Sequence, residues 1–297
     1  MKRSLSILCT LASLASPLIS MAETTPAPKA ATRSKAAPGA KGTPAPAAAP
    51  AVKATQAAKL APPPALPVAQ IVERNVTARG GLAAWRAVGT LTMAGEMDAG
   101  GKQETRLPYV LSLKRPRKSR LEVKFRDQTA VQVWDGKQGW KVRPYLNRGE
   151  VEPFTAAEAR SAAAAAELDG PLVDFERKGT QVELAGTEVV DGRNTYKLKL
   201  TPKDGQPLHL WIDASTFLEA RIEGEPRRID GHLRKVTVTY RDFRPEGGLQ
   251  FPHTLETAVE TVKGSHKMTV QAIKVGPPLD DGLFAKPAQS PTRLAMP

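Results

Sequence analysis

Cysteine is almost absent from this sequence of 297 residues, because the only one, Cys9, lies near the N-terminus. Residues 1–22 combine a basic start, the apolar run 5–19 and small residues before Glu23, which is typical of a secretory signal peptide cleaved after Ala22. Cleavage would remove Cys9, which excludes a disulfide framework, thiolate metal ligands and a cysteine nucleophile. We therefore expect an exported, periplasmic protein, with retention of the segment as an anchor as the alternative.

Catalytic and ligand-binding motifs are also missing. The sequence has no Gly-x-Ser-x-Gly elbow, phosphate loop or dinucleotide fingerprint. The four histidines are scattered without metal-ligand spacing. In the segment LHLWID, His209, Trp211 and Asp213 share one strand face, and cross-strand packing explains them better than catalysis. We predict no catalytic residues, no metal and no cofactor.

The net charge of +13 is not concentrated in one domain. The predicted signal peptide contributes +2 and residues 23–66 contribute +5, so the remaining 231 residues have only a mild basic excess of +6. Such an excess is ordinary for a soluble domain, and export argues further against a nucleic-acid partner. We also expect no transmembrane span in the mature protein, and a monomer.

The composition divides the chain into four parts. Residues 23–66 are rich in Ala, Pro and Lys and have few large apolar side chains, which predicts a disordered, semi-rigid linker. Residues 67–287 are the predicted domain, and residues 288–297 are a predicted disordered tail.

The domain begins with a helical pattern over 68–78, stopped by Gly80 and Gly81, and continues mainly with strands. About eleven segments alternate apolar and polar residues, and short turns join them into an antiparallel meander. Residues 155–169 predict an alanine-rich helix, with Thr155 and Glu158 forming a capping box. This pattern leaves a sandwich, a barrel and a single curved sheet covered by helices as possible folds.

The stretch VWDGKQGWKV predicts a hairpin that carries two of the four tryptophans. Placing the apolar residues of both arms on one face sets Val133 opposite Trp140 and Trp134 opposite Gly139. The two tryptophans then point to opposite faces. We expect Trp140 to face the apolar interior and Trp134 to lie on the outer face.

Several motifs, in order, resemble LolA-like outer-membrane lipoprotein-sorting proteins, in the broad and mostly uncharacterised branch of that superfamily. They are ARGGLAAWRAVGTLTMAGEM, WDGKQGW, WIDASTFLEARIEGE, VTVTYRDFRPEGGLQFPHTLE and PPLDDGLFAKP, and the resemblance that they carry extends over the predicted domain, residues 67–287. The resemblance implies a mainly antiparallel α+β fold, in which one strongly curved sheet forms an unclosed β-barrel. Helices would cover its concave apolar face as a lid. The family's lid-locking arginine has Arg106 as its candidate here.

The resemblance also implies a non-catalytic binding protein for lipids or lipoprotein acyl chains, in lipoprotein sorting or lipid transfer. A tethered envelope sensor or adaptor of the RseB type, which binds a protein partner, is the alternative, and an enzyme acting on lipid or cell wall is a third hypothesis. The candidate ligand-binding residues of the cavity are Met93, Tyr109, Leu111, Phe125, Val133, Trp140, Tyr196, Leu210, Val238 and Phe251.

Overall fold

The computed structural model describes residues 61–98, 106–144, 148–203 and 205–288. The predicted signal peptide, most of the predicted linker and nearly all of the predicted tail lie outside the described residues. The last linker residues, 61–66, lie against strand β8 (Arg193–Thr201). There the Tyr196 hydroxyl donates a hydrogen bond of 2.9 Å to the carbonyl of Pro64.

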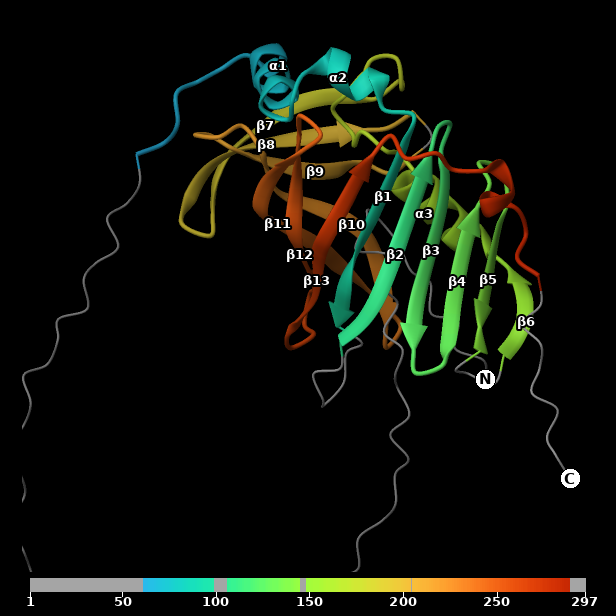
Figure 1. The fold of residues 1–297 in the computed structure, drawn as a ribbon. Coiled ribbons are helices and arrows are strands. Elements are labelled where there is room, and N and C mark those ends of the chain that lie inside the picture. Colours follow the sequence, from blue (N-terminus) through green and yellow to red (C-terminus); the bar gives the residue numbers. More distant parts are fainter. Residues whose placement is uncertain (1–60, 99–105, 145–147, 204, 289–297) are drawn as a thin grey trace, which may run out of the picture.

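Thirteen strands form one antiparallel sheet in the described part of the chain (Figure 1). Their order is β6-β5-β4-β3-β2-β1-β13-β12-β11-β10-β9-β8-β7. The strands are β1 (Thr90–Asp98), β2 (Arg106–Lys114), β3 (Lys118–Phe125), β4 (Gln128–Trp134), β5 (Gly139–Arg143), β6 (Arg148–Pro153), β7 (Gln181–Val190), β8, β9 (Leu208–Asp213), β10 (Glu219–Ile229), β11 (His232–Glu246), β12 (Leu249–Val259) and β13 (Ser265–Val275). The two edge strands, β6 and β7, do not pair with each other, so the sheet is open.

The sheet consists of two meanders rather than the one expected from the sequence. Strands β1–β6 form the first and β7–β13 the second, and pairing of β1 with β13 joins them. The predicted number of eleven strands was too low because β6 and β7 were not recognised. Strand β7 is an edge strand with mostly exposed residues, so its sequence lacks the apolar alternation that marks a half-buried strand. In Figure 1, β7–β9 run across the direction of β2–β5.

Helices α1 (Val68–Ala78) and α2 (Leu82–Ala87) confirm the predicted helical start of the domain. Gly80 separates them with a φ of 113°, a conformation that favours glycine. A Cβ atom on Gly80 would lie 2.5 Å from the carbonyl oxygen of Gly248, in the turn between β11 and β12. Glycine at this position therefore lets the helical segment approach one end of the sheet.

Helix α3 (Ala156–Ala165) has the predicted capping box. The amide of Glu158 donates to the Thr155 hydroxyl at 3.3 Å, and the amide of Thr155 donates to the Glu158 carboxylate at 2.7 Å. The helix ends four residues before the expected Asp169, and the chain continues through residues 168–173, which pack on the core.

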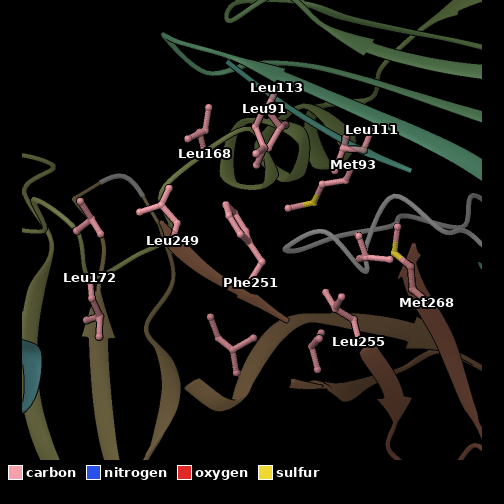
Figure 2. Packing of buried hydrophobic residues seen from close by; sticks show 14 of the residues in the cluster. Leu91, Met93, Leu111, Leu113, Leu168, Leu172, Leu249, Phe251, Leu255 and Met268 are labelled. Atoms are coloured by element: carbon pink, nitrogen blue, oxygen red, sulfur yellow. The ribbon is translucent and has the colours of Figure 1, made fainter. Parts of the chain in front are cut away.

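One large cluster of buried apolar residues occupies one face of the sheet. Strands β1–β3 and β8–β13, helices α1 and α2, and residues 168–173 all contribute to it. Figure 2 shows side chains of β1 and β2 pointing toward those of β12 and β13 across this region. We call the sheet face that carries this cluster the interior face.

Candidate functional site

Eight of the ten candidate binding residues lie on the interior face. Seven are buried members of the cluster, and the eighth, Phe125, packs against it half-buried. The seven are Met93, Tyr109, Leu111, Tyr196, Leu210, Val238 and Phe251. They come from six strands, so both meanders line one continuous apolar surface. Burial on this surface raises the pKa of Tyr109. Their contact with a ligand stays a prediction.

The hairpin of β4 and β5 has the predicted register, with Val133 opposite Trp140 and Trp134 opposite Gly139. The predicted faces, however, were wrong. Strand β3 pairs Leu121, a member of the cluster, with Gln132, so it is Gln132 and its alternate neighbour Trp134 that face the interior. Val133 and Trp140 therefore lie on the opposite face and are removed from the candidate site.

Both faces of this hairpin are covered, which explains why its alternation was misleading. On the interior side, Trp134 packs with Ala162 and Ala166 at the end of α3. Gly139 leaves room there for Phe154, whose ring would lie 2.0 Å from a Cβ atom at that position.

On the opposite side, the short 3₁₀ helix η3 (Asp281–Phe284) lies against β3, where Arg120 donates to the carbonyl of Leu283 at 3.2 Å. Arg120 is paired with Val133, which is fully buried on this face.

Asp169 is the centre of a charged group that fixes the segment after α3. Its carboxylate is buried and accepts hydrogen bonds from Arg115 at 2.8 Å and from Lys178 at 2.5 Å. Burial raises the pKa of Asp169, but the hydrogen bonds and charges of Lys178 and Arg115 outweigh it, so the pKa lies below its ordinary value. The segment is thus held in place by a buried ionised carboxylate with two cationic partners.

Arg79, just after α1, adds a third cation to the same region. Its Nη1 donates to the carbonyl of Asp169 at 2.7 Å, and its Nε lies 3.4 Å from the carboxylate of Glu219. The guanidinium also stacks over Trp85, 4.3 Å from the ring centroid. We call Arg79, Arg115, Asp169 and Lys178 the Asp169 cluster, which ties α1, the β2–β3 turn and residues 168–173 together.

The lid-locking candidate, Arg106, lies at the start of β2. It is two-thirds exposed, and its ion pair is a long one of 3.9 Å to Glu96 on the neighbouring strand. Sequence reasoning missed Arg79, Arg115 and Asp169 because no motif marks them, and Asp169 had been interpreted as the end of a helix. Only the pairing of distant segments brings them together.

The segment LHLWID has the packing role expected for it. His209 Nδ1 lies 2.7 Å from the Glu223 carboxylate, and the Trp211 indole donates to Glu188 at 3.0 Å. Glu223 is on the neighbouring strand β10, whereas Glu188 is on β7, which β8 separates from β9. Trp211 packs with Val190 and Ala220 on the face opposite the interior.

Within the described ranges, no group of three or more His, Cys, Asp or Glu side chains is arranged to hold a metal ion. Over the same residues, none of the helices has the length and apolar character needed to cross a membrane. A hollow of about 460 Å³ lies beside α1, lined by Gln70, Glu73, Arg74, Thr77, Ala78 and Phe217, and none of the candidate residues lines it.

The open antiparallel sheet and its apolar interior face place this chain in the class of proteins that are built on one sheet with an extended apolar face. The sequence matches no known family profile, and no curated protein is found as a relative.

Solved structures are similar in fold. A LolA superfamily protein from Nitrosomonas europaea has a TM-score of 0.52 and 18% identity, covering 75% of this chain and 99% of that one. A DUF1329 family protein from Desulfovibrio piger has a TM-score of 0.50 and 16% identity, covering 74% and 97%. The resemblance to the LolA superfamily is therefore confirmed at the level of the fold.

Proposed function

We propose that this protein is an exported, non-catalytic binding protein for lipids or lipoprotein acyl chains. The observation that carries the proposal is the continuous apolar interior face, to which nine of the thirteen strands contribute. In this proposal the sheet is curved around that face, and α1, α2 and α3 act as its cover. The fold similarity to a LolA superfamily protein supports it.

The physical basis of binding is burial of apolar surface. Each methylene group moved from water to an apolar environment contributes about 0.8 kcal/mol. An acyl chain on the interior face would therefore gain several kcal/mol without any polar contact. In this proposal the covering helices move together to admit the acyl chain. The Asp169 cluster is the point at which the segment after α3 stays attached to α1 and to the β2–β3 turn.

Native mass spectrometry of the full chain, purified from an envelope fraction without detergent, tests the proposal. We expect added mass that matches an acyl-chain lipid, and we expect the delipidated protein to bind oleyl alcohol in calorimetry. Retention of a protein partner with no bound lipid, and no binding of oleyl alcohol, would overturn the proposal in favour of a tethered adaptor.

Two matched variants locate the site. Met93→Trp adds bulk on the interior face, where Met93 is buried, and should weaken oleyl alcohol binding by about tenfold. Val110→Trp makes a similar change at a partly exposed position of β2 that pairs with Ala94, the residue after Met93, and should leave binding unchanged. Equal effects of the two substitutions would place binding elsewhere. Circular dichroism checks that both variants fold.

A further inference from the structure

Two arginines face each other where β10 and β11 meet their connecting turn. Arg227 on β10 is the direct cross-strand partner of Arg234 on β11, after a one-residue register shift that follows Gly224. Side chains alternate along a strand, so Arg234 points to the same side as Val236 and Val238. Since Val238 belongs to the buried cluster, the two guanidinium groups continue the interior face beyond its apolar part.

Among the described residues, neither arginine has a side-chain partner. No hydrogen bond or ion pair within the described residues involves the side chain of Arg227 or Arg234. The Nε atoms of both expose less than 1 Å² and lack a hydrogen-bond partner. Arg228, the neighbour of Arg227, instead points outward, is exposed, and donates to the carbonyl of Gly231 at 2.7 Å. In this hairpin, the arginines without a partner among the described residues are thus the two that point toward the interior.

The described groups around the two arginines form no ion pair with them. His266 on β13 lies on the same side as Met268 of the cluster. Burial, and then the charge of Arg227, lower the pKa of His266, which favours its neutral form. The nearest acidic influence on His266 is Asp98, whose carboxylate accepts from the amide of Lys267 and forms no ion pair with either arginine.

Like charges placed directly opposite each other destabilise a sheet, and partly buried charges without partners cost further free energy. An anion between the two guanidinium groups would reverse both effects. Guanidinium groups bind carboxylates and phosphates through paired hydrogen bonds, which are among the stronger ones in proteins. The two arginines also lie at the border of an apolar surface. A ligand that fits both features must therefore be apolar on one side and anionic on the other.

We propose that Arg227 and Arg234 bind the anionic head group, carboxylate or phosphate, of an amphiphile whose acyl chain lies on the interior face. This inference rests on the proposed function and narrows it to anionic lipids. Neutral acyl compounds would still bind through the apolar face, but more weakly.

Calorimetry with the delipidated full chain tests the inference, using two pairs of probes that differ only in the head group. Oleic acid at pH 8 is compared with oleyl alcohol, and oleoyl lysophosphatidic acid with monooleoylglycerol, all below their critical micelle concentrations. We expect the anionic member of at least one pair to bind about tenfold more tightly or better. A preference in the first pair identifies a carboxylate ligand, and one in the second pair a phosphate ligand.

Three variants assign the effect to the residues. Arg227→Gln and Arg234→Gln should each reduce binding of the anionic probe by about tenfold and leave the neutral probe unchanged. Arg228→Gln removes the same charge from the outer side of the hairpin and should change neither. Arg227→Lys keeps the charge but loses the paired hydrogen bonds, so it should fall between Arg227→Gln and the unaltered protein.

The possible failures are distinct. Equal affinity for both members of each pair would overturn this inference and leave the proposed function standing, whereas binding of none of the four probes would overturn both. An effect of Arg228→Gln as large as that of Arg227→Gln would show attraction to a diffuse surface charge and would also overturn the inference.

Discussion

The two ends of the interior use the same type of side chain in opposite ways. At the α1–α2 end, Arg79 has a carbonyl, a carboxylate and an aromatic ring around it. At the β10–β11 end, Arg227 and Arg234 face each other, and no side chain in the described ranges pairs with either. Strand β11 connects the two ends, and its 15 residues span roughly 45 Å at about 3.3 Å per residue.

This difference separates a structural role from one that serves a ligand. A buried charge with partners stabilises the arrangement of the segments that supply those partners, and its loss is costly. A partly buried charge without partners loses part of its solvation on folding and gains no stabilising interaction in return. We therefore expect substitutions at the two ends to change stability in opposite directions, as the following predictions make measurable.

The largest effect is expected at Arg79. Arg79→Gln leaves the buried carboxylate of Glu219 and the carbonyl of Asp169 without their partner. We expect the free energy of unfolding in urea to fall by about 3 to 5 kcal/mol. Arg86→Gln, which breaks the partly exposed pair with Asp174, is the control and should cost less than about 1 kcal/mol. Similar losses from both substitutions would contradict a structural role for the Asp169 cluster.

The next largest effect is expected at Trp134, on which the end of α3 packs. Trp134→Ala removes the ring on which the end of α3 packs and should lower the free energy of unfolding by about 3 kcal/mol. Trp140→Ala, in the same hairpin but half-buried on the opposite face, should cost roughly half as much. A greater loss from Trp140→Ala would mean that the original assignment of faces was right. Urea unfolding followed by far-ultraviolet circular dichroism measures both.

Acidification should loosen the Asp169 end before the arginine end. The pKa of Asp169 is lowered in the folded protein, so its contribution is complete above the unfolded pKa of about 3.9 and is lost as the pH falls through the folded pKa. Hydrogen exchange from pH 6 down to about pH 3 should show falling protection in residues 168–173. The same amides in Asp169→Asn should already be less protected at pH 6 and should change less with pH.

The smallest effect, and of opposite sign, is expected at the arginine pair. Arg227→Gln removes a like-charge contact and should raise the free energy of unfolding of the lipid-free chain by a few tenths of a kcal/mol, up to about 1 kcal/mol. Thermal unfolding of the variant and of Arg228→Gln, compared at low salt, measures the difference. A clear loss of stability in Arg227→Gln would show that the guanidinium has a structural partner and that the contrast between the two ends is wrong.

Local sequence signals predicted much of the secondary structure. The first helix and the cap of α3 follow from backbone chemistry within a few residues, and both are confirmed. The register of the VWDGKQGWKV hairpin is also confirmed, because a short turn and the alternation of both arms leave few ways to pair them. Strand β7 was missed because an exposed edge strand has no apolar face to leave a pattern.

The faces of β4 and β5 show what local sequence signals do not determine. Alternation tells which residues share a face, but it does not tell which face meets the interior. At β4 and β5 both faces carry buried side chains: Trp134 packs against α3 on one face, and Val133 and Val142 are buried on the other. Val133 and Trp140 were therefore placed on the interior, whereas Trp134 is the residue that lies there.

By itself, the sequence determined an antiparallel β domain with one largely apolar strand face, a helical start and a capped alanine-rich helix. These properties depend on contacts between residues close in the sequence or on neighbouring strands. The tertiary structure alone decided that β1 pairs with β13, that Asp169 meets Arg115 and Arg79, and that the β10–β11 hairpin turns two arginines toward the interior. Each of these depends on segments far apart in the chain, whose meeting is set by packing of the whole sheet and not by any local pattern.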